Sequence, residues 1–97
     1  MRAYDLDKNG GATNERVLVP RIEGIPDGIR LDENGNLYVA AANIEVFTAE
    51  GKQLGNVHIT EAPSNCAFGD ADFESLYITA RTSIYRVRLK AKGSVQY

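Results

Sequence analysis

A repeat of about 39 residues constrains this chain more than any other feature of its sequence. The triplet Leu37-Tyr38-Val39 returns as Leu76-Tyr77-Ile78, 39 residues further along the chain. The strand-like segment after each triplet returns as well, first at residues 44–47 and then at residues 84–87. This period lies near the ~40–45 residues that a four-stranded propeller blade occupies. The repeat therefore predicts about two copies of one β-sheet unit.

Within each copy, the spacing of the apolar residues predicts strands and no helix. Residues 26–40 combine a Pro-Asp-Gly turn, a short apolar strand, an Asn-Gly turn and a second strand. Along most of the chain the periodicity is of the two-residue kind, and Gly, Pro, Asn and Asp residues mark the turns between strands. The predicted strands are residues 2–6, 16–19, 28–31, 37–41, 44–48, 55–59, 66–69, 76–80 and 83–89.

The apolar side chains of these strands are expected to fill the space between neighbouring sheets. The aliphatic residues and one phenylalanine in this predicted core are Ile29, Leu31, Leu37, Val39, Phe68, Leu76 and Ile78. The larger aromatic side chains expected to pack in this core are Tyr38, Phe47, Tyr77 and Tyr85.

The repeat indicates that the whole chain is one partial propeller unit with an all-β fold. Residues 1–19 are interpreted as the end of one blade, residues 20–60 as a complete blade and residues 61–97 as most of a further blade. The last few residues, 93–97, follow the final predicted strand and are expected to form an untethered end.

Composition and charge argue against several classes of partner. The 97 residues carry a net charge of −2, and Lys and Arg do not gather in a basic run, so nucleic acid and anionic membrane surfaces are not expected partners. No apolar run approaches the ~20 residues of a membrane-spanning helix, and the first residues lack the pattern of a secretory signal. The one cysteine, Cys66, cannot form an internal disulfide, which fits a reducing compartment. We therefore expect a cytoplasmic location.

Two segments resemble a known family. The run "IPDGIRLDENGNLYVAA" and, after it, "SNCAFGDADFESLYITARTSIYRVRL" are similar to the C-terminal third of the regucalcin (senescence marker protein) and gluconolactonase family of six-bladed propellers. The resemblance covers nearly the whole chain. It implies that the predicted sheets are about two four-stranded blades of a six-bladed β-propeller, with partial blades at both ends.

The resemblance also implies a function, a metal-dependent hydrolase of sugar lactones. Family members hold one divalent cation, often calcium or zinc, with a Glu from the first blade, an Asn from a middle blade and the Asp of the Pro-Asp-Gly turn. Asp27 matches that Asp, so the resemblance implies that Asp27 binds the cation and is the base that activates water, while the cation polarises the lactone carbonyl. Pro-Asp-Gly is also an ordinary turn sequence, so a purely structural role for Asp27 stays open.

Asn65 occupies in the second copy the position that Asp27 occupies in the first. By that analogy Asn65 faces the channel and touches the substrate or a water, although its amide could instead tie down its own turn. Cys66 is interpreted as a buried structural thiol, because the one histidine, His58, is expected on an outer strand of the preceding blade. Residues 5–10 imitate half of a calcium-binding loop, but Arg16 stands where a bidentate Glu is needed, so a polar turn is expected there.

Two blades alone would leave large apolar faces uncovered. We therefore expect either a homo-oligomer, in which three copies complete a six-bladed ring, or an association with missing N-terminal blades that carry the other metal ligands. Two functions remain open. The chain is either a sugar-lactone hydrolase, or a fragment of one, acting on a small polar lactone, or a non-catalytic propeller fragment that serves assembly or binding.

Overall fold

The computed structural model describes residues 1–94 as an all-β structure, in agreement with the predicted fold class. Within this range there is no helix that could span a membrane. The strands are β1 (Arg2–Leu6), β2 (Ala12–Val17), β3 (Ile29–Leu31), β4 (Leu37–Ala40), β5 (Ile44–Phe47), β6 (Gln53–Val57), β7 (Asn65–Gly69), β8 (Ser75–Thr79) and β9 (Ile84–Arg88).

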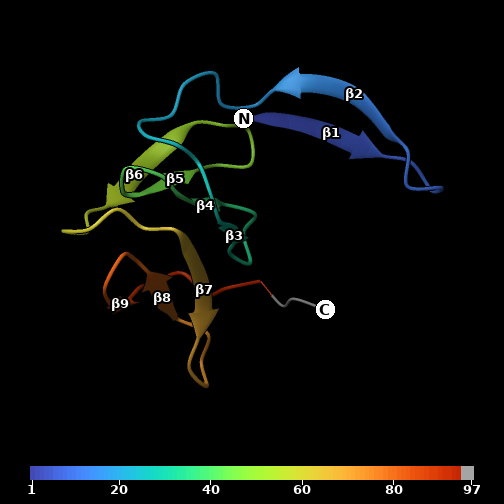
Figure 1. Ribbon diagram of the computed structural model, residues 1–97. Helices are drawn as coiled ribbons and strands as arrows, with labels where there is room; N and C mark the ends of the chain where they lie inside the picture. The colour runs from blue at the N-terminus through green and yellow to red at the C-terminus, as the bar shows by residue number, and fades with distance from the viewer. Residues whose placement is uncertain (95–97) are drawn as a thin grey trace.

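Three antiparallel sheets follow one another along the chain (Figure 1). The hairpin β1–β2 comes first, then the four-stranded sheet β3-β4-β5-β6, then the three-stranded sheet β7-β8-β9. Within each sheet, each strand pairs with its neighbour in sequence, as in a propeller blade, and β3 and β7 are the first strands of the two larger sheets.

The main error in the predicted strands concerns β2, which begins at Ala12 rather than at Arg16. The cause is a tight turn directly after β1, where one carboxylate oxygen of Asp7 accepts hydrogen bonds from the backbone N–H groups of Asn9 (2.9 Å) and Gly11 (2.7 Å). Because of this turn, β2 pairs with β1 from Ala12 onward, directly after the turn. The prediction missed this part of β2 because its polar residues show no alternation of apolar and polar side chains. It is also the polar turn that was expected in place of a calcium loop.

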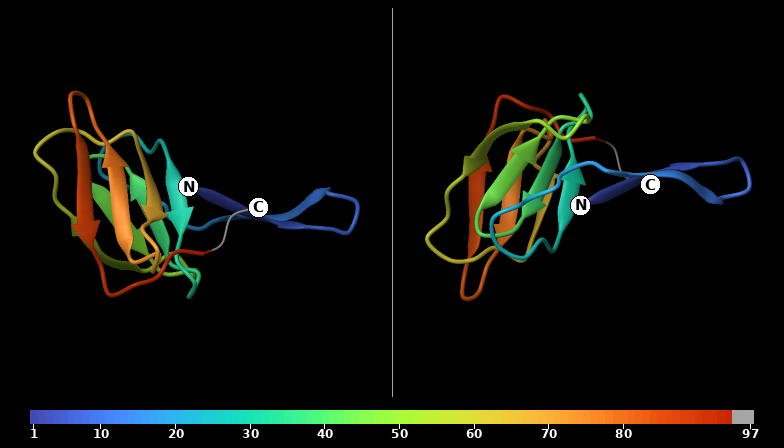
Figure 2. Two further views of the ribbon diagram at one scale, coloured as in Figure 1. Left: turned by 90° about the horizontal axis from the view of Figure 1, so that it is seen from below. Right: turned by 90° about the horizontal axis from the view of Figure 1, so that it is seen from above.

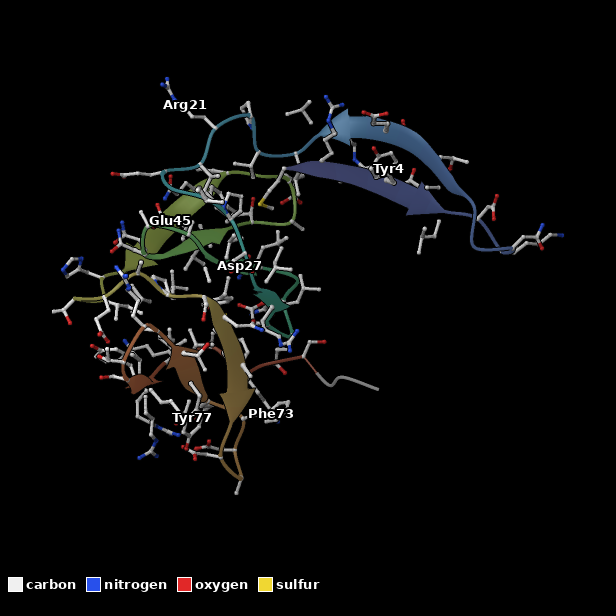
Figure 3. All side chains as sticks on the ribbon, in the orientation of Figure 1. Tyr4, Arg21, Asp27, Glu45, Phe73 and Tyr77 are labelled. Carbon is white, nitrogen blue, oxygen red and sulfur yellow. The ribbon has the colours of Figure 1, made fainter. Side chains whose placement is uncertain are left out.

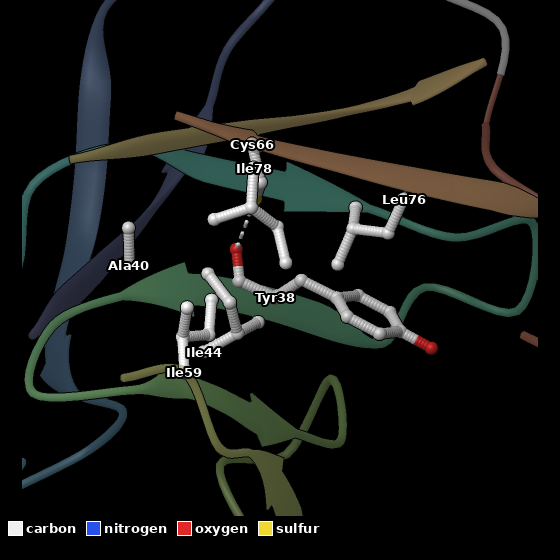
Figure 4. Close-up of a cluster of buried hydrophobic side chains, with 7 residues drawn as sticks. All are labelled: Tyr38, Ala40, Ile44, Ile59, Cys66, Leu76 and Ile78. Atoms are coloured by element: carbon white, nitrogen blue, oxygen red, sulfur yellow. Dashed lines mark hydrogen bonds between the residues drawn. The ribbon is translucent and has the colours of Figure 1, made fainter. Parts of the chain in front are cut away.

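The core lies between the four-stranded and three-stranded sheets, which pack face to face (Figure 2). Figure 4 shows its buried side chains, which are Tyr38, Ala40, Ile44, Ile59, Cys66, Leu76 and Ile78. The ring of Tyr38 meets that of Phe68 edge to face, with centroids 5.2 Å apart and an interplanar angle of 86°. The alternation of the sequence explains this arrangement, since every second residue of β4, β5 and β8 points into this layer.

The predicted core is wrong at Ile29 and Leu31, which are 42% and 41% exposed. Both pair with the residues of β4 that point away from the layer between the sheets. On that side lies a second and smaller cluster of Val19, Val39 and Phe47, with Met1, Leu18, Ile22 and Leu37 packed against it. Ile29 and Leu31 therefore lie on a sheet face that residues 1–94 cover only in part.

The end of the described chain is tied to β3, so the expected untethered end is wrong for Gly93 and Ser94. Gly93 N–H donates to Phe73 O (2.9 Å), and Ser94 N–H donates to Leu31 O (3.0 Å). A Cβ atom at Gly93 would lie 2.3 Å from Phe68 Cβ, so only glycine fits this close approach. The remainder of that predicted end, residues 95–97, lies outside the described residues.

Candidate functional site

Asp27 lies just before β3, at the edge of the four-stranded sheet (Figure 3). Its backbone N–H donates to Ala40 O at 2.8 Å, and the N–H of Gly28 donates to Ser64 O at 3.0 Å. The first bond extends the pairing with β4, and the second links the start of β3 to the residue before β7. The carboxyl side chain of Asp27 is exposed, so it is accessible to a ligand.

Asn65, the first residue of β7, lies directly beside this segment. A Cβ atom at Gly28 would lie 2.0 Å from Asn65 Oδ1 and 2.8 Å from Asn65 Cα. Gly28 is therefore required for the close approach of the two inner strands, a role that the repeat alone did not reveal. The structure thus brings the segments that carry Asp27 and Asn65 together, on neighbouring sheets.

Two observations bear on the side chain of Asn65. Its Oδ1 accepts a hydrogen bond from Cys66 N–H at 2.8 Å, which ties down the start of β7. Asn65 also lines a cavity of about 200 Å³, together with Arg30, Cys66, Ala67, Tyr77 and Thr79. Arg30 is half-buried at this cavity and was not singled out from the sequence, because its position depends on how β3 packs against β7.

The interpretation of Cys66 as a buried structural thiol is confirmed. Its side chain is 3% exposed, its Sγ–H points to Tyr38 O at 3.8 Å, and burial raises the pKa of the thiol to about 11. His58 lies in the exposed chain after β6, where its Nδ1 is 3.0 Å from Asn43 Oδ1. The structure provides no thiol–imidazole pair from these two residues, so they do not form a nucleophilic site.

Asp27 and Asn65 offer the oxygen ligands that a hard divalent cation prefers, but calcium takes 6–8 of them. Residues 1–94 contain no group of three or more His, Cys, Asp and Glu side chains that could hold a metal. The ligand types of Asp27 and Asn65 are therefore suitable for calcium, but these two residues are too few to hold the ion by themselves.

The sequence of this chain is similar to those of known proteins over most of its length. The family described as "SMP-30/Gluconolactonase/LRE-like region" matches residues 1–82. The chain is 34% identical over 101 aligned residues to a gluconolactonase of Zymomonas mobilis, covering 93% of this chain and 28% of that protein. It is 36% identical over 88 residues to a regucalcin of Danio rerio, covering 82% of this chain and 30% of the relative.

A solved structure agrees with these relatives. A gluconolactonase from Xanthomonas campestris superposes with a TM-score of 0.81 at 27% sequence identity, over 91% of this chain and 29% of that structure. The chain thus spans less than a third of the length of these three proteins.

Proposed function

The chain belongs to the SMP-30/gluconolactonase/LRE-like family, and on that basis we propose that it contributes part of a lactone hydrolase of the gluconolactonase type. The observation that carries the proposal is the match of residues 1–82 to this family together with the accessible Asp27 beside Asn65. The proposed substrate is a small polar lactone, and the proposed reaction is the addition of water to its carbonyl carbon.

Asp27 is proposed as one ligand of a divalent cation, calcium or zinc, and as the base that accepts a proton from the attacking water. A bound cation supplies polarisation of the lactone carbonyl at such a site. Asn65 is proposed to hydrogen-bond the substrate, since it lines a cavity together with Arg30. The remaining oxygen ligands must come from outside residues 1–94.

Those ligands require further blades, supplied either by copies of this chain that complete a ring or by N-terminal blades of a longer protein. The uncovered apolar side chains support this association, because Tyr4, Leu6 and Ile84 are 46%, 74% and 73% exposed. The same observation favours the second candidate function, a non-catalytic propeller fragment that serves assembly. The proposed cytoplasmic location rests only on the sequence.

The decisive experiment measures opening of gluconolactone by the purified chain with calcium or zinc, after its mass in solution has been determined. If the hydrolase proposal is right, Asp27→Asn lowers the rate roughly 100-fold or more, as expected for loss of a general base. Glu50→Gln, which removes the same charge from an exposed turn, leaves the rate unchanged. A chain that assembles but stays inactive with both metals supports the assembly function instead.

A further inference from the structure

Arg30 of β3 is half-buried, whereas every other arginine of the chain is exposed. The exposed arginines that form ion pairs with carboxylates are Arg2, Arg16, Arg86 and Arg88. Arg30 forms no such pair within residues 1–94, where its one side-chain hydrogen bond runs from Nη1 to Ile29 O at 3.3 Å. A guanidinium group has five N–H donors, and its removal from water is unfavourable unless acceptors replace the water. The described chain therefore leaves most of these donors without an acceptor.

The hydrogen bond to Ile29 O places the guanidinium at the edge of β3 that faces away from β4. On this edge Leu31 O accepts a hydrogen bond from Ser94 N–H at 3.0 Å. Because carbonyl groups two residues apart in an antiparallel strand point the same way, Ile29 O lies on this edge as well. The inner strand of the next sheet, β7, packs beside β3 (Figure 1). The charge of Arg30 is felt there, since it opposes the rise in the pKa of Cys66 that burial causes.

The unused donors of Arg30 are accessible. Within residues 1–94 the one enclosed side-chain polar atom without a hydrogen-bond partner belongs to Glu45, so Nε and Nη2 of Arg30 are not sealed off from solvent. Arg30 lines two cavities of about 200 Å³ and 210 Å³, and Ala67 of β7 lines both of them. No acidic side chain lines either cavity. A ligand in these cavities can therefore reach the guanidinium without competition from a carboxylate of the lining.

The cavity of about 200 Å³ offers further donors beside Arg30. Asn65 Oδ1 already accepts a hydrogen bond from Cys66 N–H, which leaves the amide N–H groups of Asn65 as donors. The hydroxyl group of Thr79 lines the same cavity. A positive charge with neutral donors suits an anion, and a planar guanidinium matches a carboxylate in particular, because the two groups form parallel hydrogen bonds.

We propose that Arg30 binds the carboxylate of a small hydroxy acid in this cavity, the kind of product that lactone opening releases. The identity of the acid rests on the proposed function. In that reaction water adds to the carbonyl carbon, the ring C–O bond breaks, and the resulting acid loses a proton to solvent. The negative charge is thus present in the product and absent from the lactone, so Arg30 favours the product. A volume of about 200 Å³ is several times the ~30 Å³ of a liquid water molecule and accommodates a short carbon chain.

The test measures binding of gluconate to the purified chain without added metal, by the chemical shifts of backbone amides in β3 and β7 and by calorimetry. Gluconamide, in which a neutral amide replaces the carboxylate, is the matched probe. We expect gluconate to bind roughly tenfold or more tightly than gluconamide, because only the carboxylate forms a charge-assisted bond. Arg30→Gln should remove this difference. Arg81→Gln makes the same charge change at an exposed residue outside both cavities and should bind gluconate as the natural chain does.

Thermal unfolding verifies that Arg30→Gln is folded. Ala67→Leu is a second variant that keeps the charge, because Ala67 is exposed and a larger side chain there should fill the cavity and abolish gluconate binding. The proposal is overturned if gluconate does not bind, if gluconamide binds equally well, or if neither variant changes gluconate binding. None of these measurements requires catalysis. Gluconate binding through Arg30 in a chain that does not open gluconolactone would refute only the proposed hydrolase function, and lactone opening without such binding would refute only the role of Arg30.

Discussion

The hairpin β1–β2 and the two packed sheets use the same backbone pairing but bury very different amounts of side chain. All six residues of β2 are exposed, whereas Val39 and Ala40 of β4 and Leu76 and Ile78 of β8 are 1% exposed or less. The hairpin projects from the body of the molecule (Figure 2). The difference teaches that regular antiparallel pairing does not by itself make a stable unit. An isolated two-stranded hairpin is only marginally stable in water, because it has no apolar face to bury.

The two ends of the hairpin are bonded to each other, and they pack on the body through the apolar cluster of Val19, Val39 and Phe47. The amino group of Met1 donates to Val19 O at 2.7 Å, and the N–H groups of Leu18 and Val19 donate back to Met1 O. Beyond this anchor, it carries surface ion pairs of Arg2 with Glu15 and of Arg16 with Asp5, a kind of contact that adds little stability. The interpretation of residues 1–19 as the end of one blade stays a prediction.

The largest expected contrast between the two regions comes from removing an apolar side chain. Ile78→Ala leaves a cavity in the layer between the sheets and should lower the free energy of unfolding by about 2–5 kcal/mol. Leu6→Ala removes a side chain that is 74% exposed and should change it by less than about 0.5 kcal/mol. Denaturant unfolding measures both values. An equal loss for the two variants would show that the hairpin is packed in solution.

A smaller contrast is expected from adding a methyl group. Gly28→Ala places its Cβ 2.8 Å from the backbone of Asn65, which cannot move freely, and should destabilise the chain by about 1–3 kcal/mol. Gly11→Ala in the hairpin meets the side chain of Asp7, whose displacement disturbs only an exposed turn, so the loss of stability should be smaller. Thermal unfolding of the two variants compares them. A tolerated Gly28→Ala would argue against the close contact of the two inner strands.

Loss of one hydroxyl group should have a smaller effect again. Tyr38 donates to Asp32 Oδ2 at 3.2 Å, and Tyr38→Phe should lower the free energy of unfolding by about 1 kcal/mol. Burial first, and then the charge of Asp32, raise the pKa of Tyr38 to about 12. The stability that this hydroxyl contributes is therefore present below pH ~10, the ordinary tyrosine value, and is lost as the pH rises toward 12.

Unfolding at pH 8 and pH 11 distinguishes this effect from a general alkaline destabilisation. The natural chain should lose more stability between these values than Tyr38→Phe does. Tyr4→Phe in the hairpin, where the ring is 46% exposed, should behave as the natural chain.

The smallest expected effect concerns the exposed carboxylates after β7. Two hydrogen bonds from Arg88 and one from Glu74 N–H hold the pKa of Asp72 down at about 2. A carboxyl group with a lowered pKa stabilises the folded chain at pH values above its pKa in the unfolded state, ~3.9. This contribution is lost as the pH falls toward 2. Asp72→Asn should therefore show a shallower fall of the melting temperature between pH 5 and pH 2.5. An unchanged slope would mean that solvent screens the pair completely.

Sequence reasoning located the start of both inner strands, because the repeat makes Asp27 and Asn65 equivalent and each strand alternates with a period of two. It missed the requirement for Gly28 and the position of Arg30, since both depend on how closely β3 approaches β7. It also gave Glu45 no role. Glu45 is buried in the structure, and the chain before β3 lines a cavity together with it.

The sequence by itself determined most of the strands and turns and the repetition of one sheet unit, because these depend on neighbours within a few residues and on a period of 39. It did not determine the start of β2. Only the tertiary structure decided which face of each sheet is covered. Ile29 and Ile78 are both apolar strand residues, yet one is 42% exposed and the other is fully buried. The reason is that burial is a property of the surface that packs against a strand, and that surface comes from residues far away in the chain or outside it.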